Sequence, residues 1–375
     1  MEKRIELGSE QFLRDRKYLA DDSIVYRINE DDQSVTVYQS DYRITEAIIA
    51  SEVVIEGKVY PVSSIWKCAF YECLFLSHVE IPDSVTEIGE GAFELCKSLN
   101  SIKIPSLVTK ISHSVFKGCR NLTHIEIPQN VTEIGFDAFQ GCTSLININI
   151  PLSMKKIDSA FGMCTSLSNI VIPNSVTEIS GGTFDGCTSL TQIKIPNSVK
   201  SIGNSAFRGC TGLTNIVIPD SVEEIEDQAF KDCTNLREIV IPDSVKKIGG
   251  YAFEGCSDLT HIEIPNSMTS IYCFQGCTGL TRIDIPDSVT RIGDKAFSHC
   301  SNLTHIEISN SVREIGDYAF FGCLRLTTIT LSDSVVEIGS GIFGECTSLK
   351  TVIVPANKKN FFKERLPEVK CLMFK

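Results

Sequence analysis

The sequence predicts a repeat solenoid, in which short coils of chain stack on one another and share one core. Phenylalanine recurs thirteen times at steps of 23 residues, apart from one step of 22 and one of 21. Each of these phenylalanines has a cysteine three positions later, from Cys73 and Cys96 through to Cys346. We therefore expect about 13 coils of 23 residues. The phenylalanines are Phe70, Phe93, Phe116, Phe139, Phe161, Phe184, Phe207, Phe230, Phe253, Phe274, Phe297, Phe320 and Phe343.

Each copy of the repeat contains three short segments. Residues 241–263 read IPDSVKKIGGYAFEGCSDLTHIE, and the copies share I-P-x-S-V-x-x-I-G-x-x-A-F-x-G-C-x-x-L-x-x-I-x. The segment L-x-x-I-x-I-P alternates apolar and polar residues and ends in proline, which predicts a short strand. S-V-x-x-I-G predicts a second extended piece, and A-F-x-G-C a compact turn or a single helical turn. The coils are therefore expected to be mainly β, with their apolar residues facing inward.

The two ends of the chain depart from the repeat. The runs SIVYRI and SVTVYQ flank the acidic turn NEDDQ within residues 23–60, which predicts a β-hairpin that covers the first coil. Residues 1–22 are polar and charged, and we expect a short helix or a loose tail there. The last residues, NKKNFFKERLPEVKCLMFK, are basic and aromatic; we expect them to cap the last coil, with a docking segment as the alternative. The predicted division is 1–59 tail and β cap, 60–355 solenoid and 356–375 C-terminal cap.

Thirteen of the 16 cysteines belong to the repeat. One cysteine at a fixed inward position of every coil predicts a ladder of reduced core thiols, because a small, weakly polar thiol is easily buried. Adjacent coils would place the Cα atoms about 5 Å apart, a separation that disulfides also allow. No C-x-x-C pair occurs, which disfavours zinc. So many free thiols fit a reducing setting better than an oxidising one.

The charge and hydropathy of the chain disfavour several partners. The formal net charge is −12, and such a surface repels nucleic acid and anionic lipid. No stretch reaches the roughly 20 apolar residues that span a bilayer, so no membrane insertion is expected. The N-terminus has no apolar core of a secretory signal as it stands. A protein that stays inside the cell, a leader already removed, and unconventional export all remain open.

The repeat units resemble a known family. IPDSVTEIGEGAFELCKSLNSIK and IPNSVTEISGGTFDGCTSLTQIK are similar to the BspA-like, or Treponema-type, class of leucine-rich repeats, over roughly residues 60–355. The resemblance implies a curved leucine-rich-repeat solenoid. It also implies a cell-surface or secreted protein that adheres to host or matrix proteins. It carries no catalytic residues.

The candidate binding residues flank the central apolar residue of each strand, since these positions line the concave face in leucine-rich repeats. Core positions barely change between copies, whereas these positions vary. Valines near the middle suggest a modest apolar patch, and residues 261–307 a charged one. The alternative is a solvated β-face without a ligand. The candidates are Asn169, Val171, Lys194, Asn215, Val217, Glu238, Val240, His261, Glu263, Arg282, Asp284, His305 and Glu307.

His-x-Glu pairs on this face raise the question of metal binding or acid-base catalysis. His261 and His305 lie two coils apart, about 10 Å by the stacking distance, which is too far for both to ligate one ion. We therefore expect no metal site, no cofactor and no catalytic residue.

The sequence thus predicts a non-catalytic scaffold for protein binding or adhesion, of cell-surface or secreted type, whose partner is a protein and whose own state is monomeric. One alternative is an intracellular scaffold or effector that uses the same face. Another is a carbohydrate-binding or polysaccharide-processing solenoid, which would need clustered carboxylates or basic residues on one face.

Overall fold

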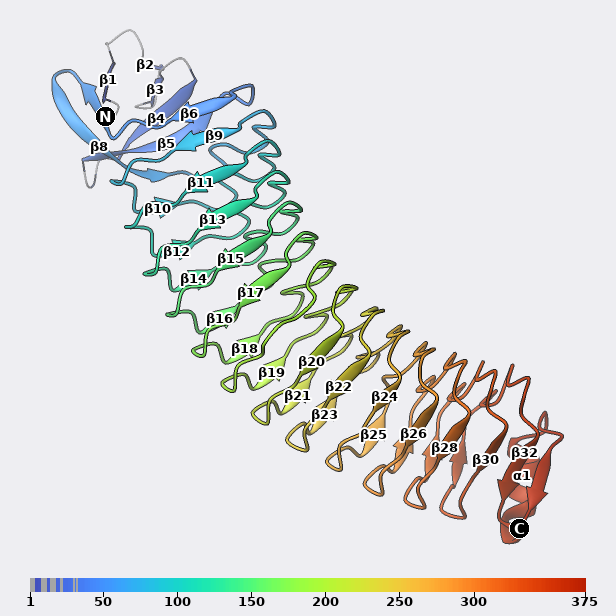
Figure 1. The fold of residues 1–375 in the computed structure, drawn as a ribbon. Helices are drawn as coiled ribbons and strands as arrows, with labels where there is room; N and C mark the ends of the chain where they lie inside the picture. Colours follow the sequence, from blue (N-terminus) through green and yellow to red (C-terminus); the bar gives the residue numbers. More distant parts are fainter. Residues whose placement is uncertain (1–3, 8–11, 14–17, 21–22, 30, 32) are drawn as a thin grey trace. The chain divides into compact units, whose positions relative to one another are not determined.

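The computed structural model describes residues 4–7, 12–13, 18–20, 23–29, 31 and 33–375. These residues form two compact units, each built of stacked coils (Figure 1). Unit 1 comprises residues 1–176 and 182–189, and unit 2 comprises residues 177–181 and 190–375. The predicted repeat solenoid is confirmed.

Unit 1 begins with a β cap. Its antiparallel pair β4 (Ile24–Asn29) and β5 (Ser34–Ser40) is the predicted hairpin. Strand β5 also pairs in parallel with β8 (Lys58–Ile65), and β8 pairs with β10 (Glu87–Ile88) of the first coil, so that the cap sheet continues into the solenoid. The described parts of residues 1–22 form strands, which corrects the expectation of a helix or a loose tail. The remaining cap strands are β1 (Arg4–Leu7), β2 (Phe12–Leu13), β3 (Tyr18–Ala20), β6 (Glu46–Ile48) and β7 (Glu52–Ile55).

Most coils contribute two short strands, one from each predicted extended segment, whereas the L-x-x-I segment at 190–195 forms no strand. In unit 1 the L-x-x-I segments form β9 (His78–Glu80), β11 (Ser101–Lys103), β13 (His124–Glu126), β15 (Asn147–Asn149) and β17 (Asn169–Val171). The second side has β10 (Glu87–Ile88), β12 (Lys110–Ile111), β14 (Glu133–Ile134) and β16 (Lys156–Ile157). Neighbouring coils pair in parallel at equivalent positions, as in Ile102↔Ile125.

Unit 2 repeats the same plan. Its L-x-x-I strands are β20 (Asn215–Val217), β22 (Glu238–Val240), β24 (His261–Ile262), β26 (Arg282–Asp284), β28 (His305–Glu307), β30 (Thr328–Thr330) and β32 (Thr351–Val354). The second side has β18 (Glu178–Ile179), β19 (Ser201–Ile202), β21 (Glu224–Ile225), β23 (Lys247–Ile248), β25 (Ser270–Ile271), β27 (Arg291–Ile292), β29 (Glu314–Ile315) and β31 (Glu337–Ile338).

The C-terminal residues cover the last coil of unit 2. They form a short 3-10 helix η2 (Ala356–Lys358), helix α1 (Lys359–Arg365) and strand β33 (Leu372–Phe374). Strand β33 pairs in parallel with β32, and Phe362 and Leu366 are buried. The apolar end of the solenoid is thereby closed, as a stacked array requires.

The repeat phenylalanines form a buried stack through each unit. In unit 1 consecutive rings lie with centroids 5.0 Å apart for Phe70 and Phe93, and 5.9 Å apart for Phe161 and Phe184. In unit 2 the stack continues across the coil that is shortened to 21 residues, because Phe274 lies 5.7 Å from Phe253 on one side and 5.7 Å from Phe297 on the other. In that coil Cys273 is buried in the place of the repeat alanine, and its carbonyl accepts the N–H of Phe253 as the alanine carbonyl does in other coils. The missing residues therefore shorten the turn before Phe274 and leave the ring stack unchanged.

All 16 cysteines are free. Most repeat thiols donate to the phenylalanine carbonyl of the preceding coil, as Cys142 does to Phe116 over 3.1 Å, whereas Cys73 in the first coil donates to Asp41 O. Burial raises the pKa of these thiols, to about 12 for Cys187 and Cys300. They are therefore protonated packing residues at neutral pH, as expected for a reduced core ladder.

The A-F-x-G-C segment is a turn, and the alternative of a helical turn is wrong. The residues two before and two after each repeat phenylalanine have positive φ, as in Gly91 (59°) and Leu95 (62°) around Phe93; the shortened coil, at Tyr272, lacks the first of these. This backbone turns the N–H groups toward the next coil, so that Phe116 N donates to Ala138 O over 2.9 Å. The turns are therefore held both by bonds between coils and by bonds within a coil, such as that from Cys96 N to Phe93 O over 3.2 Å.

Candidate binding face

The candidate residues lie on the surface that we call the strand face, the exposed side of the L-x-x-I strands. In every three-residue strand of this set the central residue is buried and both neighbours are exposed, as in β13 and β26. Period-two alternation requires this arrangement, because the central isoleucine must join the core. The variable positions and the constant ones therefore share each strand but face opposite sides.

Unit 1 carries a groove of about 610 Å³ on its strand face. Its floor is the buried row Ile125, Ile148 and Ile170, one residue from each of three successive coils. Its polar lining combines amides, an imidazole, a carboxylate and an ammonium group. The lining side chains that are polar or exposed are Lys103, Ser106, His124, Glu126, Gln129, Asn147, Asn149, Asn169 and Val171.

Amides dominate the middle of this groove. Asn147 pairs in register with Asn169, and Asn149 pairs with Val171, on the neighbouring strands β15 and β17. An amide offers both donors and an acceptor without a charge. Val171 is 69% exposed, so one wall of the groove is apolar. This surface can therefore bind backbone amides or neutral side chains and cover an aliphatic group at the same time.

The neighbouring part of the unit 1 face is charged. A second hollow of about 490 Å³ is lined by residues of β9, β11 and β13, among them His78, Glu80 and Lys103. The His78 ring lies 3.4 Å from Glu80, and His124 lies 3.8 Å from Glu126. The face of unit 1 thus changes from His–Glu pairs to amides along successive coils.

In unit 2 the predicted apolar patch is small. Val217 and Val240 are direct partners on β20 and β22 and are 69% and 57% exposed. Beside them Asn215 pairs in register with Glu238, and Lys194 is exposed on an earlier coil of the same unit. Val171, the third predicted valine, belongs to unit 1 and lies beside Asn149.

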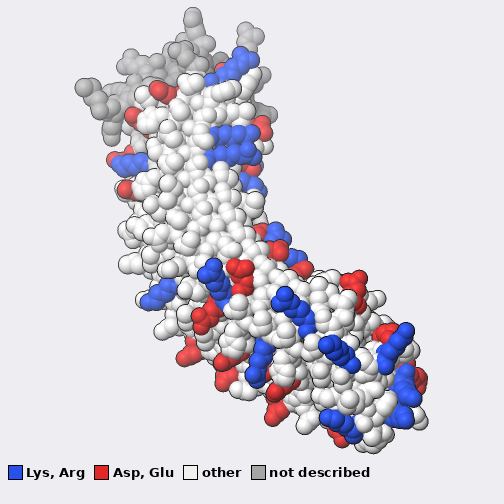
Figure 2. All heavy atoms as spheres, turned by 45° about the vertical axis from the view of Figure 1, so that its right-hand side comes forward, with Lys and Arg blue, Asp and Glu red and all other residues white. Residues whose placement is uncertain are grey.

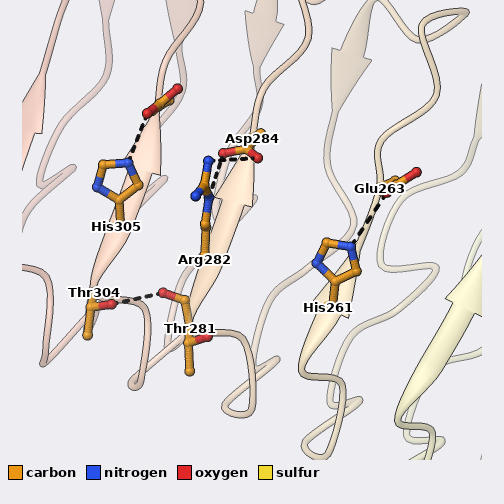
Figure 3. Close-up of polar contacts among 8 residues, drawn as sticks. His261, Glu263, Thr281, Arg282, Asp284, Thr304 and His305 are labelled. Carbon is orange, nitrogen blue, oxygen red and sulfur yellow. Dashed lines mark hydrogen bonds and ion pairs between the residues drawn. The ribbon is translucent and has the colours of Figure 1, made fainter.

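Residues 261–307 form three pairs of a basic side chain with a carboxylate, one on each of three coils (Figure 3). His261 lies 3.7 Å from Glu263, and His305 lies 3.1 Å from Glu307. Arg282 donates two hydrogen bonds to Asp284, over 3.0 and 3.2 Å.

Along these three coils the carboxylates of Glu263, Asp284 and Glu307 form one row, which we call the acidic column, and the basic side chains beside them form a second row, the basic column. Contact with Asp284 raises the pKa of Arg282, so its guanidinium stays charged. Each pair closes within its own coil and is exposed to water, where such pairs add little stability. The columns are therefore available to steer a charged partner.

Neither a metal site nor a membrane span is visible in the part of the chain that the structure describes. No group of three or more His, Cys, Asp and Glu side chains converges on one point there. No described helix has both the length and the apolar character needed to cross a bilayer.

The unit 1 groove is the feature that sequence reasoning missed. The predicted set includes Asn169 and Val171 but omits Asn147, Asn149 and the lining residues of β11 and β13. The available signal was the run of asparagines at the variable positions before and after the central strand residue, at Asn147, Asn149 and Asn169 of adjacent coils. The predicted set favours valines and charged residues because exposed apolar and charged side chains are typical of contact surfaces.

The fold and this face define a class of protein, a leucine-rich repeat scaffold with variable residues on a constant core. The BspA type Leucine rich repeat region, a family pattern of six copies, matches residues 63–188, 158–272 and 271–366. The chain belongs to this family. A search of the curated proteins finds no match.

Solved structures of bacterial proteins resemble the chain over nearly its whole length. A leucine-rich repeat protein from Bacteroides ovatus is 30% identical, with a TM-score of 0.81 over 95% of this chain and 99% of that one. A leucine rich cell surface protein from Faecalibacterium prausnitzii is 31% identical, with a TM-score of 0.62 over 90% and 94%. A leucine-rich repeat protein from Eubacterium ventriosum, at 24% identity and a TM-score of 0.57 over 88% and 94%, shares the fold.

Proposed function

We propose that the protein is a non-catalytic scaffold that binds a protein partner on its strand face. The observation that carries the proposal is the groove of about 610 Å³ in unit 1, lined by side chains that vary between coils above a constant isoleucine floor. Repeat proteins present binding surfaces in this way, because the core fixes the backbone while exposed positions are free to change.

The chemistry of the face favours a polypeptide partner. The groove joins the amides of Asn147 and Asn169 to the aliphatic side chain of Val171, and the neighbouring hollow adds His and Glu side chains. Protein interfaces combine an apolar centre with polar groups that hydrogen-bond at the rim. In unit 2, Val217 and Val240 would supply a second apolar contact beside the charged columns.

A catalytic role is the weaker proposal. Acid-base catalysis needs groups positioned together around a reacting atom. Here the imidazoles of His261 and His305 are each paired with a carboxylate of their own coil, in exposed positions. Polysaccharide cleavage that is abolished by Glu263→Ala with Glu307→Ala would support the enzyme instead.

We also propose that the scaffold acts at the cell surface, as the similar Faecalibacterium prausnitzii protein is described. An intracellular scaffold that uses the same face is the alternative, which the free thiols favour. Fractionation of the source cells, with the mature N-terminus determined by mass spectrometry, separates the two. Recovery in the surface fraction supports the first location.

The binding proposal is tested with the full chain as bait against an extract of the cells or matrix it meets. Asn147→Arg with Asn169→Arg places two bulky cations in the groove. The matched control, Asn121→Arg with Asn235→Arg, adds the same charge at exposed turn positions. A partner that the wild type and control retain, and the groove variant loses, supports the proposal. Retention of every partner by the groove variant contradicts it.

A further inference from the structure

The C-terminal cap, residues 356–375, has a charge opposite to that of the rest of the chain. It contains six lysine and arginine residues and two glutamates, a net charge of +4, within a protein of net charge −12. Five of the six cations are exposed, and Lys358 is half-buried. Figure 2 shows Lys and Arg side chains gathered at the lower end of the molecule, the end that carries the C-terminus in Figure 1.

Packing fixes the position of these cations. The buried side chains of Phe362 and Leu366 anchor α1 on the last coil, so its opposite side faces solvent. Lys359 and Lys363 are exposed at the border of this buried face, and their ammonium groups lie 5.2 and 5.8 Å from the ring centroid of Phe374 in β33. One aromatic ring thus holds two cations close together.

These two cations have no anionic partner. Among the described residues, neither Lys359 nor Lys363 forms an ion pair within 4.0 Å. Two like charges held beside one ring repel each other, and that repulsion is relieved when an anion binds between them. The cap therefore holds two neighbouring positive charges that no carboxylate of the described residues neutralises.

The cap also borders two hollows. One, of about 540 Å³, lies between the cap and the last turn and is lined by Val336, Lys358, Lys359, Asn360 and Phe361 among others. The second, of about 560 Å³, includes Asn357 and Lys375 together with the carboxylate of Asp333, so the first hollow is the more cationic of the two. Each hollow combines an ammonium group with an amide, and the first adds the half-buried ring of Phe361. Such a lining can meet anionic groups, hydroxyls and the flat face of a ring.

The acidic remainder of the chain does not cancel this local charge. Coils stack about 4.8 Å apart, and the Debye length at physiological ionic strength is about 8 Å. Acidic groups more than two coils away from the cap are therefore largely screened. The overall charge disfavours polyanions, but the cap attracts them locally.

We propose that the C-terminal cap is a binding site for a linear anionic polysaccharide. Lysine suits this partner, because its compact point charge attracts diffuse anionic groups without demanding the fork geometry of arginine. The amides of Asn357 and Asn360 suit sugar hydroxyls. An anionic membrane is a poorer fit: the Phe374 ring is covered by two ammonium groups, and hollows accept a chain more readily than a flat surface.

The test measures binding of the full chain to immobilised heparin and polygalacturonate, with dextran as the uncharged polymer. We expect binding to at least one anionic glycan and none to dextran. Lys359→Glu with Lys363→Glu should weaken that binding at least about tenfold, and raised salt should weaken the wild type. The control Lys97→Glu with Lys200→Glu makes the same charge change at exposed positions outside the cap and should retain binding.

A second variant guards against misfolding of the cap. Lys359→Gln with Lys363→Gln keeps much of each side-chain stem and removes only the charges; it should melt near the wild-type temperature and still lose the glycan. Wild type that binds neither glycan overturns the proposal, as does retained binding in both cap variants. Binding to anionic vesicles, DNA or polyglutamate with no glycan binding also overturns it. The groove variant Asn147→Arg with Asn169→Arg should bind the glycan normally, so this result is independent of the proposed function.

Discussion

The thiol of Cys119 donates to the carbonyl oxygen of Phe93, over 3.1 Å, and so joins one coil to the coil before it. The same carbonyl accepts the backbone N–H of Cys96 within its own coil, over 3.2 Å. Cysteine and phenylalanine therefore recur together because each pair completes the packing of a neighbouring pair. This relationship makes the cysteines part of the structure, and it sets the stability of the protein at alkaline pH.

Stability should fall steeply above about pH 8.5. A thiol in the unfolded chain ionises near that pH, whereas burial keeps the folded thiols protonated, with the pKa of Cys187 and Cys300 at about 12. The folded state thus holds more protons, and stability that is fully present below pH 8.5 is lost as pH rises toward 12. Each such thiol costs roughly 1.4 kcal/mol per pH unit in this window.

Urea unfolding at pH 7, 8.5, 9.5 and 10.5 measures this dependence. A variant with Cys119→Ala, Cys142→Ala and Cys164→Ala should be less stable at pH 7 but lose stability less steeply with pH, since three titrating groups are absent. An unfolding free energy that is flat from pH 8 to 10.5 would show that the buried thiols do not govern alkaline stability.

Truncation of a stacked phenylalanine should be severe. Phe139 is buried between the rings of Phe116 and Phe161, at centroid distances of 5.5 and 5.6 Å. Phe139→Ala leaves a cavity that both neighbours line, and we expect a loss of about 3–5 kcal/mol. Phe136→Ala is the matched control, because that side chain is 52% exposed and its removal should cost little. Chemical denaturation compares the two, and equal losses would contradict the ring stack as the core.

Glycine should stabilise the turns where another residue has positive φ. Glu345 is exposed and has φ of 57° at the position before the repeat cysteine. Glu345→Gly relieves left-handed strain of roughly 1–2 kcal/mol, less the flexibility that glycine adds to the unfolded chain, for a net gain of about 0.5–1 kcal/mol.

The reverse change, at the same repeat position in another coil, provides the comparison. Gly141 has φ of 73°, and a Cβ there would meet nothing closer than 3.7 Å, so Gly141→Ala introduces strain without a clash. It should lower the thermal midpoint, whereas Glu345→Gly should raise it. Shifts of the opposite sign would mean that side-chain contacts, and not φ, decide these positions.

The strand face of unit 2 should respond to charge. Val217→Glu places a carboxylate beside the exposed side chain of Val240, and Arg282→Glu turns an ion pair into a like-charge pair. If unit 2 joins the interface, each variant should weaken partner binding about tenfold or more, as measured by surface plasmon resonance. Both side chains are exposed, so the melting temperature should hardly change. Unaltered affinity in both variants would restrict the interface to unit 1.

Much of the fold could be predicted because the repeated sequence defines the length of a coil and which of its residues are buried. The Phe-x-x-Cys spacing gives the coil length, and alternation around Ile125 or Ile283 separates buried from exposed positions. The hairpin of β4 and β5 follows from two strand-like runs around a polar turn. Each of these features depends on residues that are close in sequence.

The remaining features depend on how different coils meet. The groove exists because Asn147 and Asn169 become neighbours only after stacking, and its depth depends on what their side chains leave unfilled. The left-handed turn residues were hidden because Leu95 and Glu345 occupy positions where other copies have glycine. The closed ion pairs, such as Arg282 with Asp284, depend on rotamers that spacing does not determine.

The central claim is that a protein partner contacts the strand face, and site-specific photo-crosslinking tests it most directly. A photoreactive residue is placed at Asn149 in the groove, or at Asn121 on an exposed turn as the control, and the full chain is irradiated with an extract that contains the partner. The account predicts one discrete crosslinked protein from position 149 and none from position 121. Crosslinking of that partner from position 121, with none from position 149, would contradict it.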